Sequence, residues 1–184
     1  MINPISLFIW VINILIIIYI WMGKLISKAI FKGGSNKIST EVPKNFFDLS
    51  AKDIDGKIVD FHKYQDKKVI MVVNVACKWG LTSPNYKEMV KMHNELSSRG
   101  FEILAFPSNE FFNQESGSES EIKKFVQDNF KANFPIFAKS EVNGTNPNPV
   151  FAYLRRHSEL YNKETGEARV IPWNFAKFIV NRNG

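Results

Sequence analysis

A run of seven mostly β-branched apolar residues, from Val69 to Val75 and broken only by Asn74, constrains the fold most strongly. Such a run is typical of a central strand that is buried on both faces of a sheet. Helical spacing of apolar residues follows over 83–99 and ends at Gly100, before a second apolar strand at 101–106. This strand–helix–strand order predicts an α/β domain with parallel strand pairing.

Further elements are predicted on both sides of this unit. A strand at 46–51 and a hairpin through the turn at 55–57 precede it. A second helix begins near Ser118, where acidic side chains occupy the first turn and favour the positive end of the helix dipole. A third helix over 149–157 and a last strand over 177–180 complete the predicted set.

The first 23 residues contain no charged side chain. As a helix, roughly 20 such residues would span the apolar core of a bilayer. A cleavable signal peptide, the main rival, would have a basic start, a shorter apolar stretch and a small-residue cleavage site. The sequence has none of these features, so we expect one transmembrane helix over residues 1–23.

Residues 24–44 contain five lysines and one glutamate, and therefore hold most of the net charge of +6. We interpret them as a basic, flexible linker. Lysines that follow an apolar span place the domain behind them in the cytoplasm by the positive-inside rule.

Because the positive charge lies beside the apolar segment, we expect no nucleic-acid partner. A single cysteine and three histidines argue against a disulfide framework and against a metal site.

Three motifs carry the candidate chemistry. The first, N-V-A-C-K-W-G-L-T at 74–82, lies where the buried strand gives way to a helix, whose N-terminus favours a thiolate or selenolate. The second is L-A-F-P-S-N-E-F at 104–111, which closes on Q-E-S-G at 114–117, and the third is W-N-F-A-K-F at 173–178. With these motifs in this order, residues 45–184 resemble the glutathione peroxidase family, a branch of the thioredoxin fold.

The resemblance implies a thioredoxin-like central mixed sheet flanked by helices. It implies a thiol-dependent peroxidase that reduces hydrogen peroxide and organic or lipid hydroperoxides in response to oxidative stress, with glutathione or a thioredoxin-like thiol as reductant and without a metal or organic cofactor. By position, Gln114, Trp173 and Asn174 would be the polar partners of the reactive chalcogen. The short stretch over 142–173 resembles the monomeric, phospholipid-hydroperoxide type. Family members continue beyond the last turn of this chain, so we expect a truncated C-terminus.

One departure from the family pattern affects the mechanism. Trp79 stands where the family has its peroxidatic selenocysteine or cysteine, and Cys77 stands where serine is usual. Since an indole does not attack peroxide, three interpretations remain open. Residue 79 is selenocysteine whose UGA codon was translated as Trp, or Cys77 supplies the thiolate, or the domain has lost activity and serves as a thioredoxin-fold binding module. The missing cysteine in the stretch at 126–130, where cysteine-type members often carry a resolving thiol, favours the first interpretation over the second but fits the third equally well.

Overall fold

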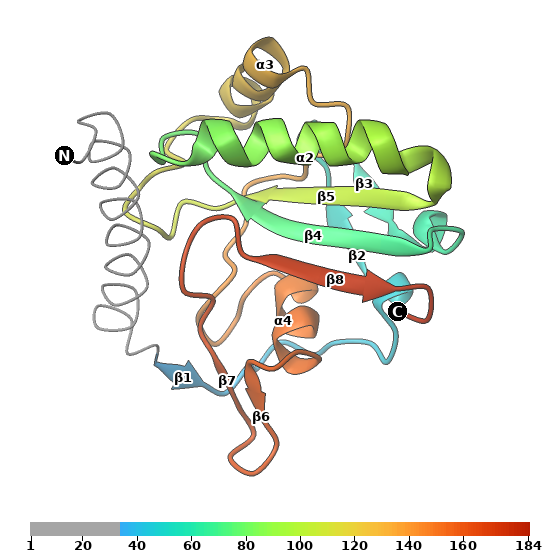
Figure 1. The fold of residues 1–184 in the computed structure, drawn as a ribbon. Coiled ribbons are helices and arrows are strands. Elements are labelled where there is room, and N and C mark those ends of the chain that lie inside the picture. The colour runs from blue at the N-terminus through green and yellow to red at the C-terminus, as the bar shows by residue number, and fades with distance from the viewer. Residues whose placement is uncertain (1–33) are drawn as a thin grey trace, which may run out of the picture. The chain divides into compact units, whose positions relative to one another are not determined.

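A three-stranded mixed sheet lies at the centre of the computed structural model, which describes residues 34–184 (Figure 1). The strands β4 (Val69–Val75), β5 (Phe101–Pro107) and β8 (Lys177–Asn181) are arranged in the order β5-β4-β8. β4 pairs with β5 in parallel and with β8 in antiparallel fashion. The carboxyl ends of β4 and β5 and the start of β8 therefore lie at the same edge of the sheet.

Helices cover both faces of this sheet. α2 (Thr82–Leu96) and α3 (Glu119–Phe130) lie on one side and α4 (Pro149–Arg156) lies on the other (Figure 1). Alternate residues of β4 pack into two different cores, Met71 and Val73 with the α2 side and Ile70 and Val72 with the α4 side. This alternation explains why the strand is apolar along nearly its whole length.

Smaller elements surround the sheet. They are the 3-10 helices η1 (Phe46–Asp48), η2 (Phe61–Tyr64) and η3 (Ser97–Arg99), the hairpin of β2 (Ser50–Lys52) and β3 (Ile58–Asp60), and a small sheet of β1 (Ser35–Asn36), β7 (Glu167–Arg169) and β6 (Tyr161–Asn162). The predicted strand at 46–51 was therefore wrong in its first half. The Asn45 side chain accepts a hydrogen bond from the Phe47 N–H, which caps a helical turn. That turn buries the rings of both Phe46 and Phe47 in one core, whereas a strand would point them to opposite faces.

The end of the expected linker belongs to the folded unit. Ser35 and Asn36 pair with β7, and the Ile38 side chain is buried. Arg155, itself fully buried, donates to the Asn36 side chain at 2.8 Å and to the Ala168 carbonyl at 3.0 Å. Residues 35–44 are thus part of the domain, and residues 24–33 lie outside the described residues.

The expected membrane helix requires a correction. In the part of the chain that the structure describes, no helix is both long and apolar enough to cross a bilayer. The longest of those helices, α2, has 15 residues and would span only about 22 Å of a roughly 30 Å apolar core. The fold class of the described residues is accordingly a thioredoxin-like α/β domain, and no membrane helix is found among them. The expected single-pass membrane location with a cytoplasmic domain is corrected on the same finding. Residues 1–23, on which that expectation rested, lie outside the described residues.

Candidate active site

The turn between β4 and α2 is fixed by the Thr82 side chain. The Thr82 hydroxyl donates to the Ala76 carbonyl at 2.6 Å and accepts from the Trp79 N–H at 3.1 Å. The Thr82 N–H in turn donates to the Trp79 carbonyl at 3.0 Å. Residue 79 is thereby held at the N-terminus of α2, where free N–H groups and the helix dipole favour a negative charge.

The third motif is attached to the same edge of the sheet by Asn74. The Asn74 side-chain amide donates to the Trp173 carbonyl at 3.0 Å and accepts from the Ala176 N–H at 2.9 Å. Its main-chain carbonyl accepts from the Phe175 N–H at 2.7 Å. From the sequence, Asn74 could be recognised only as the first residue of a motif, because its hydrogen-bond partners lie about a hundred residues away.

Two of the predicted site residues meet directly. Asn174 donates from Nδ2 to Gln114 Oε1 at 2.6 Å, and the Gln114 carbonyl accepts from the Lys78 N–H at 2.9 Å. Asn174 is only 5% exposed, and its Oδ1 atom has no hydrogen-bond partner within residues 34–184. The facing amides therefore use one NH₂ group between themselves, and the other NH₂ group of the pair belongs to Gln114.

Trp79 and Trp173 each pack against other aromatic rings. The Trp79 ring stacks on Phe175, the residue after Asn174, with ring centroids 5.5 Å apart. Phe175 has a positive φ of 58°, an unfavourable conformation for an aromatic residue that is found more often at functional sites. The Trp173 ring packs against exposed Phe112 at 5.3 Å.

Cys77 is fixed by a buried carboxyl group that sequence reasoning missed. Its thiol donates to Glu115 Oε1 at 3.3 Å, and its N–H donates to the other oxygen of the same carboxylate. Glu115 is 1% exposed. Burial, and next the negative charge of Glu115, raise the pKa of the Cys77 thiol far above its usual range. Burial also raises the pKa of Glu115 itself. A reactive cysteine has the opposite property, a lowered pKa.

This environment predicts slow alkylation of Cys77. At pH 8 the thiol stays protonated, so its rate with iodoacetamide should be at least about tenfold below that of a free cysteine, and should rise with pH beyond the ordinary thiol range. Glu115→Gln removes the charge and should lower the pKa and accelerate the reaction several-fold. Glu88→Gln, on the exposed face of α2, is the control. Because the chain has one cysteine, the mass of the alkylated protein reports on this site alone. Rapid alkylation of the unmodified protein would contradict the prediction.

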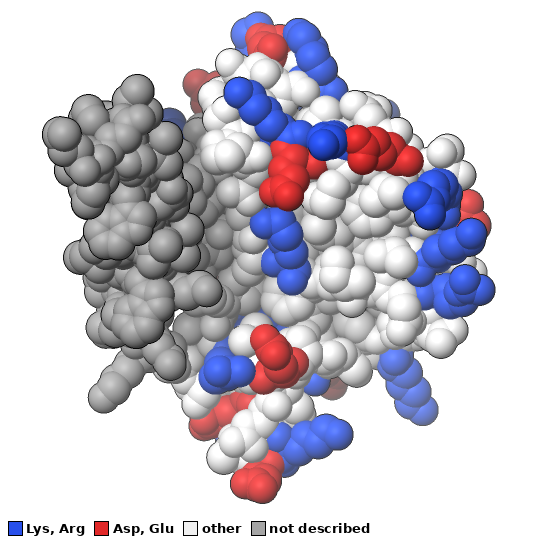
Figure 2. Space-filling model, in the orientation of Figure 1, with Lys and Arg blue, Asp and Glu red and all other residues white. Residues whose placement is uncertain are grey.

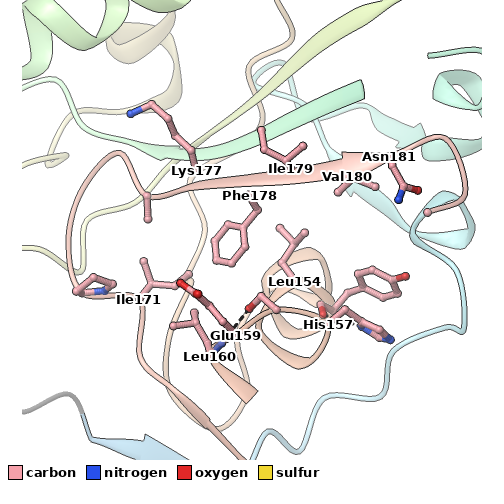
Figure 3. Close-up of a pocket in the computed structure, with 15 residues that line it drawn as sticks. Leu154, His157, Glu159, Leu160, Ile171, Lys177, Phe178, Ile179, Val180 and Asn181 are labelled. Carbon is pink, nitrogen blue, oxygen red and sulfur yellow. Dashed lines mark hydrogen bonds between the residues drawn. The ribbon is translucent and has the colours of Figure 1, made fainter. Parts of the chain in front are cut away.

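None of the predicted site residues lines the groove on the α4 side of the sheet. A groove of about 560 Å³ lies between α4 and β8 and is lined by Leu154, Phe178 and Val180 among others (Figure 3).

On the face seen in Figure 2, acidic and basic side chains are interspersed. Among residues 34–184, no group of three or more His, Cys, Asp and Glu side chains could hold a metal ion. The candidate site consists of amide side chains and aromatic rings, with Asn174 buried and Gln114 and Trp79 partly exposed.

The mixed sheet β5-β4-β8 with helices on both faces defines a thioredoxin-like fold. The structure is similar to that of a thiol:disulfide interchange protein of the thioredoxin family from Chlorobium tepidum, with a TM-score of 0.51 at 14% identity, over 79% of this chain and 83% of that one.

More specifically, the chain belongs to the glutathione peroxidase family, whose sequence profile matches residues 46–155. It is 44% identical over 146 residues to a probable phospholipid hydroperoxide glutathione peroxidase of Mesembryanthemum crystallinum, a match that covers 79% of this chain and 82% of that protein. The crystal structure of GPX1 from T. cruzi is similar with a TM-score of 0.58 at 28% identity, over 77% and 82% of the two chains. Family membership makes the protein an oxidoreductase of the peroxidase type.

Proposed function

We propose that the native protein is a thiol-dependent peroxidase that acts through a selenocysteine at position 79. The observation that supports this proposal is the Gln114–Asn174 hydrogen bond, between two residues linked to the start of α2. The Gln114 carbonyl accepts from the Lys78 N–H, and Phe175, the residue after Asn174, stacks on the ring of residue 79. Hydrogen-bond donors and a helix N-terminus both stabilise an anion and lower the pKa of a thiol or selenol. The indole of tryptophan is neutral and gains nothing from groups that stabilise an anion, whereas a selenolate is an anion and would be stabilised by them.

The reaction would proceed in three balanced steps. The selenolate attacks the outer oxygen of a hydroperoxide and the O–O bond breaks, which forms a selenenic acid. The departing alkoxide or hydroxide takes up a proton from solvent and leaves as an alcohol or water. A first thiol displaces water from the selenenic acid and forms a selenenyl sulfide. A second thiol releases the selenolate and leaves as the oxidised disulfide. We propose glutathione or a thioredoxin-like protein as the thiol, and hydrogen peroxide or organic and phospholipid hydroperoxides as substrates. The last class rests on the name of the Mesembryanthemum crystallinum relative.

Cys77 is a poor replacement for residue 79. Its thiol is held by Glu115, and both burial and that carboxyl group raise its pKa. Very little thiolate would be present at neutral pH. The interpretation in which Cys77 is the peroxidatic residue is therefore less well supported than selenocysteine at position 79.

The second candidate function is a catalytically inactive binding module of thioredoxin fold. It is favoured by the packing of Trp79, whose ring stacks on Phe175 at 5.5 Å and joins the core on the α2 side. A genuine tryptophan at this position fits the fold and removes the nucleophile. The two candidates therefore differ at a single residue.

Mass spectrometry of the protein from its native source decides between them. Trypsin cleaves after Lys78 and Lys87, so the peptide 79–87 begins with the residue in question. The mass and isotope pattern of selenium in this peptide are the expected result. An intact tryptophan would reject the selenoenzyme and leave the binding module as the better account.

A further inference from the structure

Gln114 and Asn174 come from two different loops, and a second set of contacts joins the same two loops. Gln114 lies in the segment that follows β5, and Asn174 lies in the segment that precedes β8. Beyond their direct hydrogen bond, these segments are connected through Asn143, in the loop before α4. That loop carries no residue that we assigned to the site from the sequence.

The Asn143 side chain makes two hydrogen bonds to the main chain of a single residue. The Ile171 N–H donates to Asn143 Oδ1 at 2.7 Å, and Asn143 Nδ2 donates to the Ile171 carbonyl at 3.1 Å. Ile171 is fully buried beside the groove of Figure 3, so water is a poor replacement for either bond. The Asn143 side-chain amide therefore pairs with the Ile171 main chain as a neighbouring strand would. Ile171 lies three residues before Asn174.

Asn143 is itself fixed by Glu110, from the other loop. The Asn143 N–H donates to Glu110 Oε2 at 3.1 Å, and the Val142 N–H donates to the same oxygen. Glu110 lies four residues before Gln114. The contacts therefore close a ring that runs from Glu110 through Asn143 and Ile171 to Asn174, and back through Gln114.

We propose that Asn143 is a positioning residue, which sets the place of the Trp173–Asn174 segment relative to Gln114. The proposal rests on the proposed function, in that the amide pair is the part of the site that would stabilise the reactive anion. Asn74 holds residues 173–176 at the end of β4, through the Trp173 carbonyl and the Ala176 N–H. Asn143 holds Ile171, two residues before Trp173. Without Asn143 the stretch that leads into Trp173 loses its link to the Glu110 loop, so the Trp173–Asn174 segment can shift relative to Gln114.

The chain offers a matched control in Asn148. This residue is also an asparagine of the same loop, and its side chain also makes two hydrogen bonds, to the Val150 N–H at 2.9 Å and to the Ser140 hydroxyl at 3.0 Å. It caps α4 and does not contact Ile171. Asn143→Ala and Asn148→Ala therefore each remove two hydrogen bonds, but only the first removes the support of the site segment.

The test is ¹⁹F NMR of the full chain labelled with 5-fluorotryptophan. The chain has four tryptophans, so its resonances can be assigned by single substitutions. We expect Asn143→Ala to shift or broaden the Trp173 resonance and Asn148→Ala to leave it in place. Asn143→Asp, which keeps the acceptor for the Ile171 N–H, should lie between Asn143→Ala and the unmodified protein. An unmoved Trp173 resonance in Asn143→Ala, or an equal change in Asn148→Ala, would overturn the proposal.

A second measurement connects the positioning role to chemistry. In a Trp79→Cys protein, Asn143→Ala should lower kcat/KM for hydrogen peroxide by about 10- to 100-fold and raise the pH at which the rate reaches half its maximum, while Asn148→Ala should change neither. An inactive Trp79→Cys protein in which Asn143→Ala still shifts the Trp173 resonance would reject the proposed function and support the positioning role. An active protein with no effect of Asn143→Ala on resonance or rate would reject the positioning role alone.

Discussion

Trp79→Cys is expected to convert the tryptophan-containing form of the protein, which should have no measurable peroxidase activity, into a peroxidase. Loss of the nucleophile costs enzymes that depend on covalent catalysis many orders of magnitude in rate, so its introduction should raise hydroperoxide reduction at least about 10²-fold over background. The new thiol would lie just before α2, next to Lys78, whose N–H donates to the Gln114 carbonyl, and we propose that the Gln114–Asn174 pair stabilises its anion. These groups should lower its pKa, in contrast to that of Cys77. The measurement is the rate of hydrogen peroxide consumption with glutathione or thioredoxin as reductant.

Two variants make this experiment specific. Trp79→Ser removes the same indole ring and introduces no nucleophile, so it should stay inactive. Cys77→Ser in the Trp79→Cys protein should retain most of the activity, because the Cys77 thiol is bound to Glu115 and is not the proposed nucleophile. If Trp79→Cys folds and shows no more activity than Trp79→Ser, the amide pair does not activate a chalcogen at this position.

The elements with strong periodicity could be predicted closely from the sequence. The strand over Val69–Val75 is found as predicted, and the helix that follows it differs at its ends by one and three residues. The predicted end at Gly100 is instead the end of η3, the 3-10 turn that follows α2, and the φ of 91° at this position favours glycine. The failure at 46–51 has a local cause of another kind, a side-chain cap at Asn45 that favours a turn over a strand.

The candidate site could be predicted only as far as its motifs. Gln114 and Asn174 were expected to share a site, and they share a hydrogen bond across 60 positions of sequence. No role at the site was predicted for Glu115 or Asn143, because each bonds to a distant main-chain group. Glu115 accepts from the Cys77 N–H, 38 positions away, and Asn143 accepts from the Ile171 N–H, 28 positions away. A pattern of residue types within one segment contains no information on such partners until the sheet has brought the segments together.

Asn74→Ala is expected to have the largest effect on stability among the changes near the site. Asn74 is fully buried in β4, and its side chain satisfies the Trp173 carbonyl and the Ala176 N–H. Its removal leaves both groups without their partner and opens a small cavity. Because an unsatisfied buried polar group costs about 1–3 kcal/mol, we expect a loss of about 3 kcal/mol in the free energy of unfolding. In a domain of this size the same loss lowers Tm by about 6–12 °C.

Urea unfolding followed by circular dichroism measures this loss, with Asn129→Ala as its control. Asn129 also donates a side-chain hydrogen bond to a main-chain carbonyl, that of Phe125 at 2.8 Å, but it does so at the exposed surface of α3. Water can replace that bond, and alanine favours the helix, so the control should change stability by less than about 0.5 kcal/mol. Asn74→Asp, which keeps an oxygen for the Ala176 N–H but places a carboxyl group in the core, should be destabilised as well. Equal stabilities of Asn74→Ala and Asn129→Ala would mean that the segment 173–176 is held at the sheet edge by its main chain and by Asn143, and that Asn74 is dispensable for the site.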